Sequence, residues 1–124
     1  MWIDSWAWIE FFTGSQKGQR VQEILHNTTP KTSVLSVAEV GNWCMKNNKH
    51  PEFYLSAIRK ASEIMLVDVE DAQRAGITLK KIRTLAPGMG MVDAVIYAQA
   101  VHADVRLVSG DPHFRNLPNV EFIE

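Results

Sequence analysis

Short apolar runs alternate along this chain with longer segments of helical periodicity, and this alternation restricts the fold more than any other feature. Compact apolar runs indicate buried strands, whereas apolar residues that recur every three or four positions indicate one face of a helix. Strands are expected at residues 1–3, 32–35, 64–69, 105–108 and 120–123. Helices are expected at about 5–12, 17–26, 36–48, 51–61 and 91–103, with a short helix at 71–75 that Gly76 ends and a helix or turn at 78–85. This order predicts an α/β fold built from βα units around a mainly parallel, roughly five-stranded sheet.

Length and composition describe an ordinary globular protein. A chain of 124 residues corresponds to about one domain, so residues 1–124 are expected to form a single unit. The net charge of −1 excludes a protein that coats nucleic acid through bulk positive charge, although a local cationic groove is compatible with it. Cys44 is the only cysteine, which excludes an intrachain disulfide, and its apolar helical surroundings predict a small buried residue.

The N-terminus is not typical of a signal peptide, because it carries Asp4 and Glu10 and lacks a basic region before an apolar one. No apolar run approaches the roughly 18 residues that a membrane-spanning helix needs. A cytoplasmic protein with no membrane partner is therefore expected.

Four acidic residues lie where a strand-like run gives way to a polar or helical segment. They are Asp4, Glu39, Asp93 and Asp111. Parallel strands of an open α/β sheet end along one edge, and ligands bind in the crevice there. Four carboxylates at that edge would repel one another unless cations bound them, and hard oxygen ligands suit Mg²⁺ or Mn²⁺. The pattern therefore indicates a metal-dependent enzyme that acts on phosphodiesters.

Each acid also has a local explanation. Asp4 suits the N-cap of a helix, and Asp93 suits a first turn, where the helix dipole favours an anion. Glu39 stands three residues after Ser36, the spacing of a capping box, and Asp111 suits a tight turn. These explanations account for each acid singly, but they predict a mixture of Ser, Thr, Asn and Asp at the junctions rather than four acids.

The whole chain resembles a PIN-domain ribonuclease of the small type found as VapC-like toxins. The matching motifs are residues 3–5 (IDS), 36–39 (SVAE), 91–98 (MVDAVIYA), 107–114 (LVSGDPHF) and 116–120 (NLPNV). This resemblance implies a three-layer α/β/α fold in which Asp4, Glu39, Asp93 and Asp111 form the acidic catalytic quartet. Ser5 and Ser109 match positions where the family commonly carries a hydroxyl near the metal. His113 stands where related sequences often have a further Asp.

The expected chemistry is hydrolysis of RNA with Mg²⁺ or Mn²⁺ as cofactor. We assign Asp4, Asp93 and Asp111 to the metal and Glu39 to the attacking water. His113 is a candidate proton shuttle and Arg115 a candidate phosphate contact. The resemblance implies a 5′-phosphate and a 3′-hydroxyl as the products.

Two further predictions concern the tryptophans near the N-terminus and the binding partners. Trp6 and Trp8 cannot share a helix face, so one of them is expected at the surface for base stacking or a partner contact. The resemblance implies a homodimer that a small antitoxin protein holds inactive.

Two alternatives remain. One is another Mg²⁺-dependent phosphohydrolase, although Trp6 stands where an Asp-nucleophile phosphatase carries its second Asp. The other is a non-catalytic PIN-like module that binds RNA or protein.

Overall fold

The centre of the molecule is a sheet of five strands in the order β3-β2-β1-β4-β5, and every neighbouring pair is parallel. The computed structural model describes residues 1–124. Its strands are β1 (Trp2–Ile3), β2 (Lys31–Ser33), β3 (Glu63–Met65), β4 (Leu107–Ser109) and β5 (Val120–Phe122). The prediction of a mainly parallel, five-stranded sheet is therefore confirmed.

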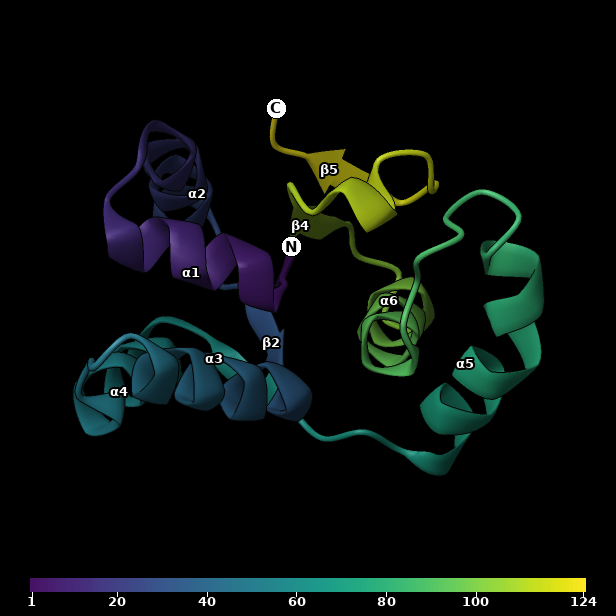
Figure 1. Cartoon of the computed structure of the whole chain (residues 1–124), viewed down its shortest axis with the longest axis horizontal. Helices are drawn as coiled ribbons and strands as arrows, with labels where there is room; N and C mark the ends of the chain where they lie inside the picture. Colours follow the sequence, from purple (N-terminus) through teal and green to yellow (C-terminus); the bar gives the residue numbers. More distant parts are fainter.

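Helices cover both faces of the sheet, which gives three layers (Figure 1). The helices are α1 (Ser5–Thr13), α2 (Gln16–Asn27), α3 (Val34–Lys46), α4 (Pro51–Ala61), α5 (Val69–Ile82) and α6 (Met91–His102), with a 3₁₀ turn η1 (Pro112–Phe114). One buried cluster joins the sheet to α1–α4, and it includes Trp8, Val40 and Cys44. A second cluster joins the sheet to α5 and α6. None of the helices has the length and the hydropathy needed for a membrane span.

Strand β1 serves both of these clusters. Side chains alternate between the two faces of a strand, so Trp2 enters the α5–α6 cluster while Ile3 enters the α1–α4 cluster. The amide of Asp4 donates to the carbonyl of Val108, which extends the pairing with β4 by one bond beyond the strand. The central strand is thus short, but it is buried on both sides.

Two predicted boundaries are wrong. The segment at 32–35 leaves the sheet after Ser33, and α3 begins at Val34 rather than at Ser36, because the Ser33 side chain accepts the cap bond from the Leu35 amide. Gly76 does not end a helix, since α5 continues through it to Ile82. A glycine within a helix costs only about 1 kcal/mol, which packing of α5 on α6 outweighs.

The third strand is also shorter than predicted. The apolar run continues past Met65, but Leu66 and Val69 are exposed, and Asp68 caps the start of α5. Apolar character alone did not distinguish the paired residues from those that connect strand to helix.

Helices α1 and α2 approach each other closely at Gly18. A β-carbon at this position would lie 2.1 Å from the backbone oxygen of Glu10, which no relaxed side chain tolerates. We predict that Gly18→Ala lowers the free energy of unfolding by about 1–3 kcal/mol, because the backbone must move apart. Urea denaturation measures this change.

Gly76→Ala is the matched control, because a β-carbon there meets no atom within 4 Å. It should raise the stability by about 0.5–1 kcal/mol, as alanine replaces glycine inside a helix. Equal effects of the two substitutions would contradict the close approach of α1 and α2.

Candidate active site

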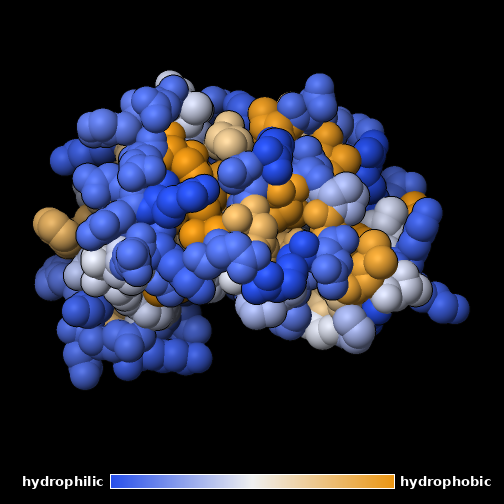
Figure 2. Space-filling model, turned by 90° about the horizontal axis from the view of Figure 1, so that it is seen from above, coloured by the Kyte–Doolittle hydropathy of each residue, from blue (hydrophilic) through white to orange (hydrophobic).

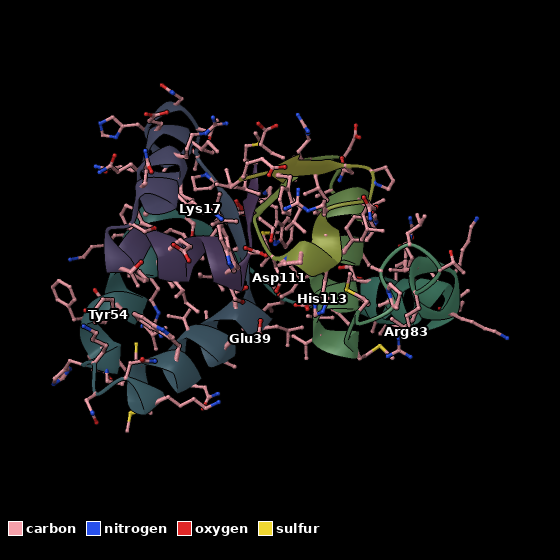
Figure 3. All side chains as sticks on the ribbon, turned by 45° about the horizontal axis from the view of Figure 1, so that its top comes forward. Lys17, Glu39, Tyr54, Arg83, Asp111 and His113 are labelled. Carbon is pink, nitrogen blue, oxygen red and sulfur yellow. The ribbon has the colours of Figure 1, made fainter.

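A cavity of about 320 Å³ lies at the carboxyl edge of the central strands. It brings together all four acids that the sequence predicted. Its lining consists of Asp4, Ser5, Trp6, Ile9, Glu39, Asn42, Asp93 and Asp111. Strands β1 and β4 are parallel neighbours, so the acids that follow them meet at one edge. Figure 3 shows Asp111 and His113 on the segment after β4, facing Glu39 on α3.

Asp4 is both a helix cap and a wall of this cavity. Its Oδ1 accepts a hydrogen bond of 2.8 Å from the Ala7 amide, as the capping explanation predicted. Burial, with the negative charges of Asp93 and Asp111 nearby, raises the pKa of Asp4 to about 8, although the Ser109 hydroxyl and the Ala7 amide act in the opposite direction. The protein alone therefore does not compensate the charge of this carboxylate.

Asp93 stands in the first turn of α6 and projects toward the same space. Its pKa rises to about 6, first because of burial and then because of the negative charges of Glu39 and Asp111; His113 lowers it. The N-cap of α6 is Gly90, which has no side chain to cap the helix, and Asp93 is the only acidic residue in the first turn.

His113 lies between two of the acids. Its Nδ1 is 3.4 Å from Asp111 Oδ1 and 3.7 Å from Asp93 Oδ2, and the three residues offer ligand atoms within 4.8 Å of one another. The other ring nitrogen packs on Gly88, where a β-carbon would lie only 2.7 Å from Nε2. The histidine thus takes a place among the acids, with one nitrogen directed at the site.

Glu39 does not form the capping box that its spacing from Ser36 suggested. Its Oε1 instead accepts a bond of 2.6 Å from the Ser5 hydroxyl, and Ser5 Oγ lies 2.9 Å from Ser36 Oγ. A hydroxyl carries a single proton, so Ser36 donates to Ser5 while Ser5 donates to Glu39. The structure therefore assigns Ser36 to a hydroxyl chain that orients Glu39, and sequence reasoning missed this role.

Ser109 and Arg115 were also predicted to support the site, and only Ser109 lies beside one of its acids. Ser109 is fully buried, and its Oγ accepts a bond of 3.0 Å from the Asp111 amide, so it shapes the turn that presents this acid. Arg115 does not line the cavity. Its guanidinium bonds Glu124 at 2.8 Å and lies 4.5 Å from the Phe122 ring centre.

The tryptophan pair divides as the spacing required. Trp8 is buried, with its Nε1 donating to Thr32, whereas Trp6 is partly exposed and lines the cavity. Lys17 Nζ lies 5.9 Å from the centre of the Trp6 ring, and Gly110 lies so close that a β-carbon would collide with the ring. Asn42 also lines the cavity, and no motif in the sequence indicated it.

A doubly covered parallel sheet with carboxylates gathered at its carboxyl edge defines an α/β protein whose site is suited to a divalent cation. The family model of the PIN domain matches residues 1–120. The chain therefore belongs to the PIN-domain family, which confirms the resemblance drawn from its motifs.

Solved structures share this fold at low sequence identity. A chain of a toxin–antitoxin complex from Klebsiella pneumoniae is 17% identical, with 99% of this chain and 97% of that chain covered and a TM-score of 0.81. A chain of VapBC2 from Rickettsia felis, bound to a promoter DNA fragment, is 16% identical over 99% and 96% of the two chains, with a TM-score of 0.75.

A third structure is VapC20 from Mycobacterium tuberculosis, a toxin that cleaves the sarcin–ricin loop. It is 14% identical over 85% of this chain and 84% of that chain, with a TM-score of 0.68. A search of curated protein sequences gives no significant match.

The raised pKa of Asp4 predicts how metal-free protein responds to pH. An unfolded Asp titrates near 3.9, so between about pH 4 and 8 the folded state binds a proton that the unfolded state does not. The contribution of Asp4 to the free energy of unfolding is therefore greatest below pH 4. It falls as the pH rises from about 4 to 8, by up to about 1.4 kcal/mol per pH unit.

Urea denaturation in EDTA at pH 5 and pH 8 measures this fall. Asp4→Asn should flatten it, because asparagine keeps the capping oxygen and cannot ionise. A pH dependence that Asp4→Asn leaves unchanged would show that another group is responsible.

Proposed function

We propose that this protein is a metal-dependent endoribonuclease and the toxin of a toxin–antitoxin pair. The observation that carries the proposal is the single cavity that four carboxylates face from four separate segments. Membership of the PIN-domain family supports nuclease chemistry. The shared fold with VapC20, a toxin that cleaves an RNA loop, supports RNA as the substrate class.

The donor set of the cavity fits a hard divalent cation. Carboxylate oxygens are the ligands that Mg²⁺ and Mn²⁺ prefer, and the raised pKa values of Asp4 and Asp93 mark negative charge that the protein does not balance. Asp4, Asp93 and Asp111 would hold the ion. When bound, such an ion lowers the pKa of a coordinated water and polarises a phosphoryl oxygen.

Glu39 is the residue that we assign to the attacking water. Its carboxylate is held through Ser5, which leaves one oxygen outside that bond to accept a proton from water. His113 stands beside Asp93 and Asp111, where a proton on its imidazole would reduce their mutual repulsion. Hydrolysis in this arrangement leaves a 5′-phosphate and a 3′-hydroxyl.

Trp6 and Lys17 are the groups that we assign to the RNA strand. Trp6 offers a partly exposed aromatic ring at the wall of the cavity, and unpaired bases stack on such rings. Lys17 lies beside it and supplies the positive charge that a phosphate requires. Arg115 is a weaker candidate than its place in the sequence suggested, because Glu124 already pairs with it.

A protein antitoxin and a second copy of the chain are the proposed partners. Three of the solved structures with this fold are toxin–antitoxin complexes. Large apolar side chains are exposed outside the acidic cavity, and Figure 2 shows apolar patches that interrupt the polar surface on one face. The most exposed are Met45, Phe53, Leu66, Val69 and Ile77. We place the protein, as one domain, in the cytoplasm, where its RNA would be found.

Cleavage of labelled single-stranded RNA and of total tRNA, with Mg²⁺ or Mn²⁺ against EDTA, tests the function. Asp93→Asn should lower the metal-dependent rate by about 10²-fold or more, because the site loses a charged ligand. Asp104→Asn is the matched control, since this exposed residue undergoes the same chemical change outside the cavity. Induced in a bacterial host, the wild type should arrest growth and Asp93→Asn should not.

Full cleavage by Asp93→Asn would refute the assignment of the site. No cleavage and no metal binding by folded wild type would favour a non-catalytic module that binds RNA or protein. Cleavage of phosphomonoesters in place of RNA would identify another Mg²⁺-dependent phosphohydrolase.

Ser5→Ala tests the orienting role of the hydroxyl chain. We predict a kcat about tenfold lower at nearly unchanged KM, because Glu39 loses its orienting bond while the remaining acids are untouched. Ser56→Ala on the exposed face of α4 should have no effect. A kcat equal to that of the wild type would exclude Ser5 from the positioning of Glu39.

A further inference from the structure

The acidic cavity has a second part that carries no carboxylate. Trp6, Ile9 and Asn42 line it beside the four acids. A metal ion and a phosphate group account for the acids, but they make no use of an indole ring, an aliphatic side chain and an amide. These three side chains together suit a flat, partly polar group, which a nucleobase is.

Helices α1 and α3 bring the three side chains to the cavity. Trp6 and Ile9 are three residues apart on α1 and therefore share one face of that helix. Asn42 follows Glu39 by three residues on α3, which places it about 4.5 Å further along the helix axis. The Asn42 amide thus lies about one helical turn from the acid that we assign to the attacking water.

The segment after β4 holds the Trp6 ring in place. A β-carbon on Gly110 would lie 2.3 Å from Cη2 and 2.6 Å from Cζ3 of this ring, so the edge of the indole rests directly on the glycine. Gly110 precedes Asp111 in the chain, which puts the ring next to one of the acids. A base that stacks on a ring already held by packing costs little further side-chain entropy.

Helix formation and packing do not explain Asn42. It stands beside Gly41 in the middle of α3, and both residue types are poor helix formers. A β-carbon on Gly41 would meet no atom within 4 Å, so close packing does not require the glycine, and Asn42 is exposed. A capping role is excluded as well, since α3 begins at Val34 and ends at Lys46. The amide is therefore available to a ligand.

We propose that Trp6, Ile9 and Asn42 form a subsite for an unpaired nucleobase next to the scissile phosphate, with Asn42 as the residue that selects the base. The inference rests on the proposed function, because RNA is the molecule that brings a base and a phosphate into one cavity. Unpaired bases stack on aromatic side chains and present their edges for hydrogen bonding. An asparagine amide donates one bond and accepts another, which matches N7 and N6 of adenine. Adenine is therefore the base that we expect.

Titration of adenosine into isotope-labelled full-length protein, followed by NMR in EDTA, tests the subsite without any cleavage. A nucleoside has no phosphate, so the acids do not repel it. The indole signal of Trp6, identified by its loss in Trp6→Phe, should shift, whereas the signals of the buried Trp2 and Trp8 should not.

Asn42→Leu should weaken the binding of adenosine by about fivefold or more, because the bonds to the edge of the base are lost. Gln73→Leu is the matched control. It replaces an exposed amide within α5, outside the cavity, and should leave the affinity for adenosine unchanged.

Sequencing of the products from a random pool of single-stranded RNA measures the same preference during cleavage. Adenine should be enriched at one position beside the cut. Asn42→Leu should reduce this enrichment by about fivefold, and Gln73→Leu should preserve it.

A Trp6 signal that does not shift, or adenosine binding that Asn42→Leu leaves unchanged, would overturn the subsite. A base preference that survives Asn42→Leu would do the same, and in these cases the ribonuclease proposal stands as long as RNA is cut. Enrichment of another base that Asn42→Leu abolishes would support the subsite and overturn the choice of adenine. RNA that stays intact with every metal would refute the ribonuclease instead, and the titration with adenosine would still decide the subsite.

Discussion

The central strand β1 is the element on which the rest of the structure depends. It is only two residues long, yet it pairs with β2 on one side and β4 on the other. Trp2 and Ile3 anchor the two helical layers from opposite faces, and Asp4 follows at once with a bond to β4. Burial on both faces therefore holds the strand in place and, with it, the most buried acid of the cavity.

At the carboxyl edge of the sheet, the burial that stabilises the fold also destabilises the charged carboxylates of the candidate site. Hydrophobic burial that stabilises β1 also removes Asp4 from water, and this burial raises its pKa more than any neighbouring charge does. Asp93 experiences the same effect to a lesser degree. A site that destabilises the empty protein in this way gains most from a bound cation, which is consistent with the function that we propose.

Helix α6 connects the two polar regions of the molecule. Its middle, from Ala94 to Ala100, is buried throughout, so its position is set by packing rather than by either end. Asp93 meets the acidic cavity, and His102 meets the carboxylates at the start of α5. The ion pair between His102 and Asp71 thus holds the far end of the helix that presents Asp93.

Much of the site could be predicted because it follows from chain order. Acids that come directly after parallel strands must arrive at one edge, so Asp4 and Asp111 were predictable from position alone. Ser33 and Ser36 are equally suited to cap a helix, and nothing in the local sequence chooses between them. Contact of Ser36 with Ser5, 31 residues away, removes it from the capping role.

The sequence by itself determined the alternation of strands and helices, the parallel sheet and the acids at its edge, because these depend on local periodicity and on strand direction. Tertiary structure decided the rest. It buried Trp8 and left Trp6 at the cavity, it paired Arg115 with Glu124, and it placed His113 between two acids. The burial and the partners of these side chains depend on contacts between segments that are distant in the sequence. Local sequence does not specify which segments meet, so it does not specify these contacts.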